Sequence, residues 1–178
     1  GVATDFATLE KEVHAAADAL REALSAAGNC TRIGISIPNG KAHIVWSLAV
    51  LCCDWTLVPV PGELAQPEKE ILLGMTAVAA VLAVEGQPWT GVSEKTMPVS
   101  AGELCALFHI GIPGAVDVPE DALAAVHPAL IRFSSGTTGT SKGVVISHAA
   151  LLARVQACNG HLGIMPGDRV LWILPMAH

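Results

Sequence analysis

The stretch that decides the fold is Ser134-Ser135-Gly136-Thr137-Thr138-Gly139-Thr140-Ser141-Lys142-Gly143. Its glycines permit positive φ angles and let the backbone come close to a ligand. Its hydroxyl side chains can donate to phosphate oxygens, and its lysine supplies a point charge. Because successive backbone N–H groups in such a turn form an anion-binding nest, the stretch predicts a phosphate-binding loop.

Two other interpretations of this stretch fit less well. The P-loop of NTPases needs glycine directly before its lysine and Ser or Thr directly after it. Here Ser141 and Gly143 occupy those two positions, so the pattern fails at both. A flexible Ser/Gly surface loop would rarely carry a lysine flanked in this way between two well-formed strands.

The segments on either side of the loop alternate between strand and helix patterns. A strand is expected at residues 129–133 directly before the loop, and a brief one at 144–146 after it. Ser147 is a fair N-cap for a helix over residues 149–158. Earlier segments read as helices at 6–27, 42–53 and 67–74 and as strands at 32–37, 55–60 and 78–84. This alternation favours an α/β fold with a mostly parallel sheet flanked by helices, with the loop at the carboxyl end of a strand.

Two regions depart from this alternation. Residues 85–128 contain scattered Gly, Pro and Ser, and we expect an irregular connecting region there, with one candidate short strand at 104–110. A last strand is expected at 169–174, and the chain stops at His178 soon after it. We therefore expect residues 1–178 to be a truncated or proteolysed part of a longer domain.

Composition excludes several classes of protein. Hydrophobic residues make up 52% of the 178 residues, which indicates an ordered core rather than a disordered chain. The net charge is -6 and Lys+Arg total only 10, which argues against a nucleic-acid partner. No apolar run reaches the ~18–20 residues of a membrane span, and the N-terminus has no signal-peptide pattern. A cytoplasmic protein without a transmembrane segment is expected.

The cysteines and histidines predict no metal site. The five cysteines match no zinc spacing, so we expect buried, reduced thiols. The histidines before His178 also lack metal spacing and are expected to be structural or exposed; they are His14, His43, His109, His127, His148 and His161.

The loop resembles the signature loop of the adenylate-forming superfamily: acyl-CoA synthetases, peptide-synthetase adenylation domains and firefly-type luciferases. That loop reads roughly [Thr/Ser]-Ser-Gly-[Thr/Ser]-Thr-Gly-x-Pro-Lys-Gly, and this chain departs from it only at Ser141, where proline is usual. The likeness continues in the family's order through Ile33 to Gly40 with its Pro-Asn, Ser47 to Pro61, Val144 to His148, Pro166 to Val170, and Pro175 to His178. In the last of these motifs Ala177 stands where an aromatic residue is usual.

The resemblance implies a fold and a chemistry. The chain would be the first subdomain of the large N-terminal, AMP-binding domain of an adenylate-forming ligase. A carboxylic acid would react with ATP to give an acyl-adenylate, and coenzyme A or a carrier's pantetheine would then displace AMP. The loop would hold the ATP phosphates with Mg²⁺, through Ser134, Ser135, Gly136, Thr137, Thr138, Gly139 and Lys142. His178 would lie beside the acyl carboxylate as a substrate-binding residue.

The same resemblance leaves the substrate open. An acyl-CoA synthetase of fatty acid metabolism is the first hypothesis, and an amino-acid-activating adenylation domain of a peptide synthetase is the alternative. The family's catalytic lysine is expected downstream, so no catalytic residue is assigned and the chain alone is expected to be inactive. A non-catalytic scaffold half, or a homodimer formed through an exposed sheet edge, is the third possibility.

Overall fold

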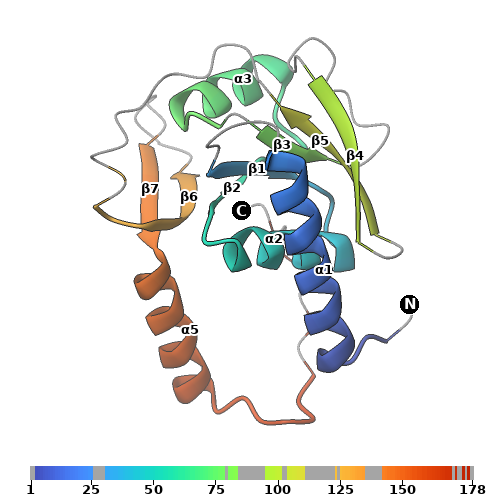
Figure 1. The fold of residues 1–178 in the computed structure, drawn as a ribbon. Coiled ribbons are helices and arrows are strands. Elements are labelled where there is room, and N and C mark those ends of the chain that lie inside the picture. Colours follow the sequence, from blue (N-terminus) through green and yellow to red (C-terminus); the bar gives the residue numbers. More distant parts are fainter. Residues whose placement is uncertain are drawn as a thin grey trace.

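A computed structural model gives the fold of the chain (Figure 1). It describes residues 3–25, 31–78, 80–83, 95–101, 104–110, 123, 125–134, 142–169, 171, 174 and 176. The helices are α1 (Phe6–Ser25), α2 (Lys41–Cys52), α3 (Gln66–Met75) and α5 (His148–Leu162). The strands are β1 (Arg32–Ser36), β2 (Thr56–Pro59), β3 (Ala80–Ala83), β4 (Lys95–Ala101), β5 (Leu104–Ile110), β6 (Pro128–Ser134) and β7 (Lys142–Ser147).

The strands form one seven-stranded sheet in the order β4-β5-β3-β1-β2-β6-β7. At its centre β1 pairs in parallel with β2 and β3, and β2 pairs in parallel with β6. Toward the edges, β5 runs antiparallel to β3 and β4, and β7 runs antiparallel to β6. The predicted α/β architecture is confirmed, with parallel strands in the middle of the sheet and antiparallel strands at both edges.

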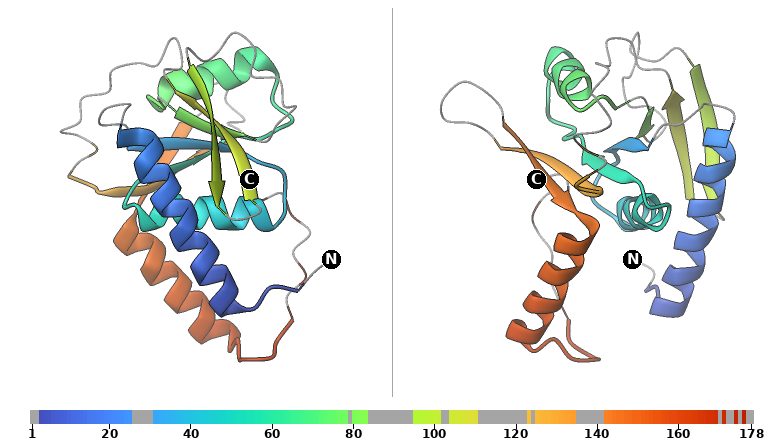
Figure 2. Two further views of the ribbon diagram at one scale, coloured as in Figure 1. Left: turned by 45° about the vertical axis from the view of Figure 1, so that its right-hand side comes forward. Right: turned by 60° about the vertical axis from the view of Figure 1, so that its left-hand side comes forward.

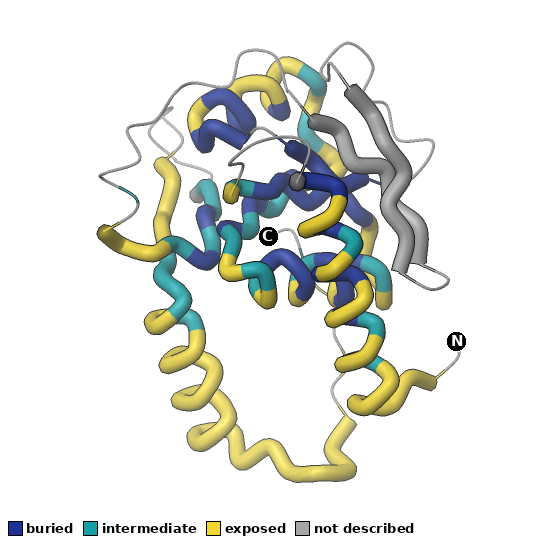
Figure 3. The backbone as a smooth tube through the Cα atoms, in the orientation of Figure 1, coloured by how far each residue is buried: buried dark blue, intermediate teal, exposed yellow. Residues whose placement is uncertain are grey.

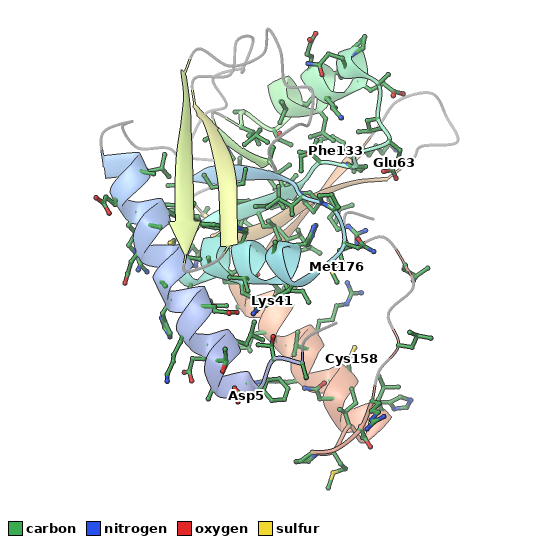
Figure 4. All side chains as sticks on the ribbon, turned by 90° about the vertical axis from the view of Figure 1, so that its right-hand side faces the viewer. Asp5, Lys41, Glu63, Phe133, Cys158 and Met176 are labelled. Atoms are coloured by element: carbon green, nitrogen blue, oxygen red, sulfur yellow. The ribbon has the colours of Figure 1, made fainter. Side chains whose placement is uncertain are left out.

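Helices α1 and α2 pack together and cover one face of the sheet. The apolar residues of α1 recur at helical spacing, which places Leu20 in the core at 0% exposure. Trp46 of α2 is also completely buried in this cluster. An ion pair of 2.6 Å between Lys41 Nζ and Glu12 Oε1 joins the two helices nearer the surface (Figure 4).

Helix α3 covers the opposite face. Its Leu72 and Leu73 pack with Val58, Val81 and Ile131 of the sheet. Burial of each such side chain contributes about 1.5–3 kcal/mol to stability. Because helices cover both faces of the parallel centre, β3 is buried at every position, which explains its continuous apolar sequence.

The region expected to be irregular contains a β-hairpin. The candidate strand at 104–110 is present as β5, and it pairs with β4, an antiparallel strand that was not predicted from the sequence. Pro98 lies within β4, opposite Leu107. A proline cannot donate a hydrogen bond to a neighbouring strand, so it is compatible with β4 because this strand lies at the edge of the sheet.

Helix α5 differs from the other helices because none of its residues is buried (Figure 3). In both views of Figure 2 it extends away from the sheet. Leu152, Val155 and Leu162 are among its exposed apolar side chains. The strand expected at 169–174 is not formed at the described positions Arg169, Leu171 and Leu174, none of which pairs with another strand. Within the described part of the chain, no helix has the length and apolar character needed to cross a membrane.

Candidate functional site at the carboxyl edge of the sheet

The phosphate-loop candidate connects two paired strands. Strand β6 ends at Ser134 and β7 begins at Lys142, and these two residues face each other in the antiparallel register. The loop is therefore the connection of a β-hairpin whose ends are fixed by strand pairing. Residues Ser135, Gly136, Thr137, Thr138 and Gly139 lie outside the described residues, as does the side chain of Ser134.

The local sequence explains why the hairpin closes here. Phe133 and Gly143 form the adjacent pair in the register. The phenyl ring of Phe133 packs against the cluster beneath α3 (Figure 4), and a Cβ on Gly143 would lie 3.4 Å from that ring. One side of the hairpin is thereby anchored to the core, while Lys142 on β7 is exposed to solvent.

The loop lies at the edge of the sheet where open α/β folds bind ligands. Since β3, β1, β2 and β6 are parallel, their carboxyl ends share one edge. After β1 the chain turns to α2 on one face, and after β2 it turns to α3 on the other face. The carboxyl edge beside two strands whose connections diverge in this way is the usual ligand position in open α/β sheets.

The Pro-Asn motif after β1 holds Leu174 and Met176 at this edge. The Asn39 side chain donates from Nδ2 to the Leu174 carbonyl at 2.9 Å. Its Oδ1 accepts from the Met176 backbone N–H at 2.8 Å. His178, the expected substrate-binding residue, lies outside the described residues, but the two hydrogen bonds hold Leu174 and Met176 just after the carboxyl end of β1.

A buried histidine supports the turn that carries Asn39. His43 is 5% exposed, and its Nδ1 lies 2.6 Å from the Ile37 carbonyl oxygen, to which it can donate. The prediction that His43 is structural is confirmed. His14 and His161 are exposed, as expected, and the side chain of His109 lies outside the description.

Sequence reasoning missed one group of polar residues at the opposite edge of the sheet. His127 and His148 lie together with Asp54, so that one ligand atom from each residue falls within 4.8 Å of the others. The three residues are far apart in the sequence, and no spacing pattern connects them. Only the strand pairing brings them together.

The expectation of buried thiols is wrong for two of the cysteines. Cys52 and Cys158 are exposed, and Cys53 is only partly buried. All three are free thiols. Cys52 occupies the last position of α2 and Cys158 lies on the unpacked α5, which explains their exposure. Cys30 and the side chain of Cys105 lie outside the described residues.

The donor set at the carboxyl edge suits phosphate. Hydroxyl groups, backbone N–H groups and a lysine ammonium are hydrogen-bond donors, and phosphate oxygens are acceptors. These groups do not favour direct coordination of Mg²⁺, which prefers carboxylate, phosphate and water oxygens. The chemistry of the loop sequence is thus compatible with a polyphosphate ligand, while the geometry of residues 135–141 lies outside the description.

Comparison with known proteins identifies the class. A family model described as AMP-binding enzyme matches residues 1–178. The chain belongs to this family of adenylate-forming enzymes.

Its relatives among characterised proteins are much longer. Pyochelin synthetase PchF of Pseudomonas aeruginosa is 31% identical over 172 residues, covering 94% of this chain and 9% of PchF. Nonribosomal peptide synthetase GRA1 of Gibberella zeae is 32% identical over 137 residues, covering 74% of this chain and 2% of GRA1. The anguibactin system regulator of Vibrio anguillarum is 30% identical over 168 residues, covering 94% of this chain and 15% of the regulator. The chain thus spans a small part of each relative.

Solved structures agree on the fold. IdnL1 superposes with a TM-score of 0.74 at 21% identity, covering 98% of this chain and 34% of IdnL1. The o-succinylbenzoate CoA synthetase MenE of Bacillus subtilis, in complex with its acyl-adenylate intermediate, superposes with a TM-score of 0.72 at 22% identity. The match covers 98% of this chain and 44% of MenE. At these identities the likeness extends to the fold alone.

Proposed function

We propose that the chain is the phosphate-loop part of an enzyme that activates a carboxylic acid with ATP and passes the acyl group to a thiol. The observation that carries this proposal is the hairpin between Ser134 and Lys142, which sets a loop of the family's sequence at the ligand-binding edge of the sheet. Family membership over residues 1–178 supports the same chemistry.

In the proposed reaction a carboxylate oxygen attacks the α-phosphorus of ATP. The bond from that phosphorus to the bridging oxygen breaks, and pyrophosphate leaves with the electron pair. The role of the loop is to hold the β- and γ-phosphates in line and to stabilise the negative charge of the leaving group. Lys142 supplies the positive charge, while Thr137, Thr138 and the hydroxyls and N–H groups beside them donate hydrogen bonds.

The second half of the reaction needs a thiol and groups outside this chain. A thiol sulfur attacks the acyl carbon, its proton is released, and AMP departs. Coenzyme A or a carrier-bound pantetheine is the proposed acceptor, and Mg²⁺ the proposed companion of ATP. Since the chain covers 34% and 44% of two solved structures with this fold, we propose that it does not complete adenylation alone.

The relatives bear on the identity of the acid. Relatives at 31% and 32% identity carry the names pyochelin synthetase and nonribosomal peptide synthetase, whereas the solved CoA synthetase is 22% identical. We therefore place an amino acid, loaded onto a carrier, ahead of a fatty acid as substrate. One feature favours an acyl-CoA ligase instead: at Pro175 to His178 the chain lacks the aspartate usual in amino-acid-activating domains. In either case His178 is the proposed contact to the acid.

Binding of ATP to the purified protein tests the role of the loop. Replacement Lys142→Ala removes the charged donor and is expected to weaken ATP binding about tenfold or more, as loss of a charge-assisted hydrogen bond implies. Lys11→Ala is the matched control, because Lys11 is an exposed lysine on α1. Equal ATP affinity in both variants and the native protein would reject the assignment.

Two activity measurements test the remaining steps. ATP–pyrophosphate exchange by a longer protein that contains this chain, with a panel of amino acids, aryl acids and fatty acids, tests the identity of the acid. Exchange with fatty acids alone would overturn the preferred substrate class. Pyrophosphate release by residues 1–178 in isolation tests whether adenylation needs further segments. Steady turnover would contradict the proposal that the chain does not complete adenylation alone.

A further inference from the structure

Three short segments meet at the amino edge of the sheet, opposite the phosphate loop. Thr56 at the start of β2 donates from Oγ1 to the carbonyl of Pro128 at the start of β6, at 2.8 Å. Asp54 lies two residues before Thr56, and His127 lies one residue before Pro128. The amino ends of these parallel neighbours therefore bring the carboxylate and the first imidazole together.

The hairpin adds the third residue. Pro128 of β6 faces Ser147 of β7, and His148 follows as the first residue of α5. The backbone N–H of His148 donates to the His127 carbonyl at 3.2 Å. The two imidazole rings lie 4.8 Å apart between centroids, with their planes tilted by 32°.

The ligand atoms of the three side chains converge. His127 Nε2 lies 2.9 Å from Asp54 Oδ2, and His148 Nε2 lies 3.7 Å from Asp54 Oδ1. The latter distance is too long for a hydrogen bond. His148 Nε2 is thus shielded from solvent, lies near the Asp54 carboxylate and has no hydrogen-bond partner among the described residues. This observation indicates that the nitrogen can bind a further ligand.

We propose that Asp54, His127 and His148 form a binding site for a divalent transition-metal ion of the Zn²⁺ class. Two imidazoles and one carboxylate are donors that suit Zn²⁺, and they are the wrong set for the oxygen-seeking Mg²⁺. Bonds of about 2.0–2.2 Å around a tetrahedral ion separate neighbouring ligand atoms by about 3.4 Å. The three ligand atoms already lie within 4.8 Å of one another, so side-chain rotation suffices to close the site.

The surroundings agree with a cation. The carboxylate offsets the partial positive charge at the amino end of α5, beside His148. The Asp54 and His127 side chains are 67% and 60% exposed, against 22% for His148, so a metal ion can enter from solvent and a water can take a fourth position. The site is separate from the proposed ATP site, because Pro128 and Ser134 stand at opposite ends of β6, about 20 Å apart at strand rise.

A metal ion at this site would cross-link three segments of the chain. It would join the turn before β2, the turn before β6 and the start of α5, and so fix the hairpin that carries the phosphate loop at its other end. A metal ion that binds the folded state and not the unfolded chain raises the temperature of unfolding.

Zn²⁺ titration of the metal-free purified protein by calorimetry tests the site, with Co²⁺ absorption as a spectroscopic readout of coordination. The variants are Asp54→Asn, His127→Asn and His148→Gln. Asn is chosen because Asp54 and His127 have φ of 64° and 49°, a conformation that Asn adopts readily. His161→Gln, an exposed histidine on the last turn of α5, is the matched control.

The native protein and the control are expected to bind one Zn²⁺ per chain with equal affinity, and each site variant about tenfold or more weakly. Thermal unfolding, measured without and with Zn²⁺, distinguishes a variant that folds poorly from one that has lost Zn²⁺ binding. A variant that unfolds normally without metal but gains no stability from Zn²⁺ supports the site. Zn²⁺ binding that the three substitutions leave unchanged, or no binding by the native protein, overturns it.

Discussion

The Asn39 side chain accepts a hydrogen bond from the Met176 backbone N–H at 2.8 Å, across 137 positions of sequence. Its amide nitrogen donates to the Leu174 carbonyl in the same segment. Asn39 thereby satisfies the N–H of Met176 and the carbonyl of Leu174, two described residues that lie in no strand. The side chain connects the carboxyl end of β1 to the segment that carries the proposed acid contact.

Replacement of Asn39 tests this connection. Asn39→Ala removes both hydrogen bonds, each worth about 1 kcal/mol net, so exchange of the Met176 amide is expected to accelerate about fivefold or more. Asn39→Asp keeps an oxygen for the Met176 N–H and loses the donor to Leu174. Amide exchange should therefore remain slower at Met176 in Asn39→Asp than in Asn39→Ala, and equal rates in the two variants would contradict the assigned contact.

Gly34 permits close packing in the central strand. A Cβ at this position would lie 2.9 Å from Val81 Cγ2 and 3.3 Å from Val78 Cγ1. Gly34→Ala is therefore expected to lower the free energy of unfolding by about 1–3 kcal/mol through overpacking. Gly160→Ala on the exposed α5 meets nothing within 4 Å and should stabilise by up to about 1 kcal/mol. Urea unfolding of both variants measures the difference, and equal effects would argue against crowding at Gly34.

Helix α5 depends on local interactions, since none of its residues is buried. The Ser147 Oγ accepts from the Ala150 N–H at 3.1 Å, as an N-cap does. Ser147→Ala is expected to cost about 1 kcal/mol of helix stability, measured as faster amide exchange along α5. Ser147→Asp can still cap the helix and should retain protection. If both variants exchange alike, the cap does not govern the helix.

Where the sequence predicted the fold well, short-range patterns carry the information. The apolar spacing of α1 predicts its buried side, and the Pro38-Asn39-Gly40 turn predicts the end of β1. Strand β4 was not predicted because Pro98 interrupts it and polar residues stand on both sides, at Lys95, Thr96 and Ser100. The reason is physical: an edge strand needs neither a full set of ladder donors nor burial on both faces.

The contacts of the sites were harder to predict, because they depend on strand order. The loop sequence predicts phosphate binding by itself. In contrast, Asn39 meets Met176, and Asp54 meets His127, only after the sheet has formed. The pairing of β2 with β6 decides the second contact, and no periodicity of the sequence encodes it.

Burial at the junction of α1 and α2 raises the pKa of the Cys53 thiol to about 11 from its ordinary 9.0. The nearby Arg21 charge lowers this pKa, while Cys52 and Asp18 raise it further. The thiol donates to the Ala17 carbonyl at 3.5 Å, a contact that fixes its position in the folded protein.

The raised pKa predicts slow alkylation of Cys53. At pH 8 its thiolate fraction is about a hundredfold below that of an unperturbed thiol, and the thiolate is the reactive form. In a Cys52→Ser background, iodoacetamide should modify the exposed Cys158 first and Cys53 far more slowly, as measured by peptide mass spectrometry. Comparable rates for Cys53 and Cys158 would contradict the burial.

The same shift gives a pH dependence of stability with a definite sign. Because the folded-state pKa lies above the unfolded value, the unfolded chain loses this proton first as the pH rises. The contribution of Cys53 is therefore complete below about pH 9 and disappears as the pH approaches about 11. Denaturant unfolding at pH 8 and pH 11 should reveal a fall in the free energy of unfolding that is smaller in Cys53→Ala. An identical fall in both proteins would assign the pH dependence to other groups.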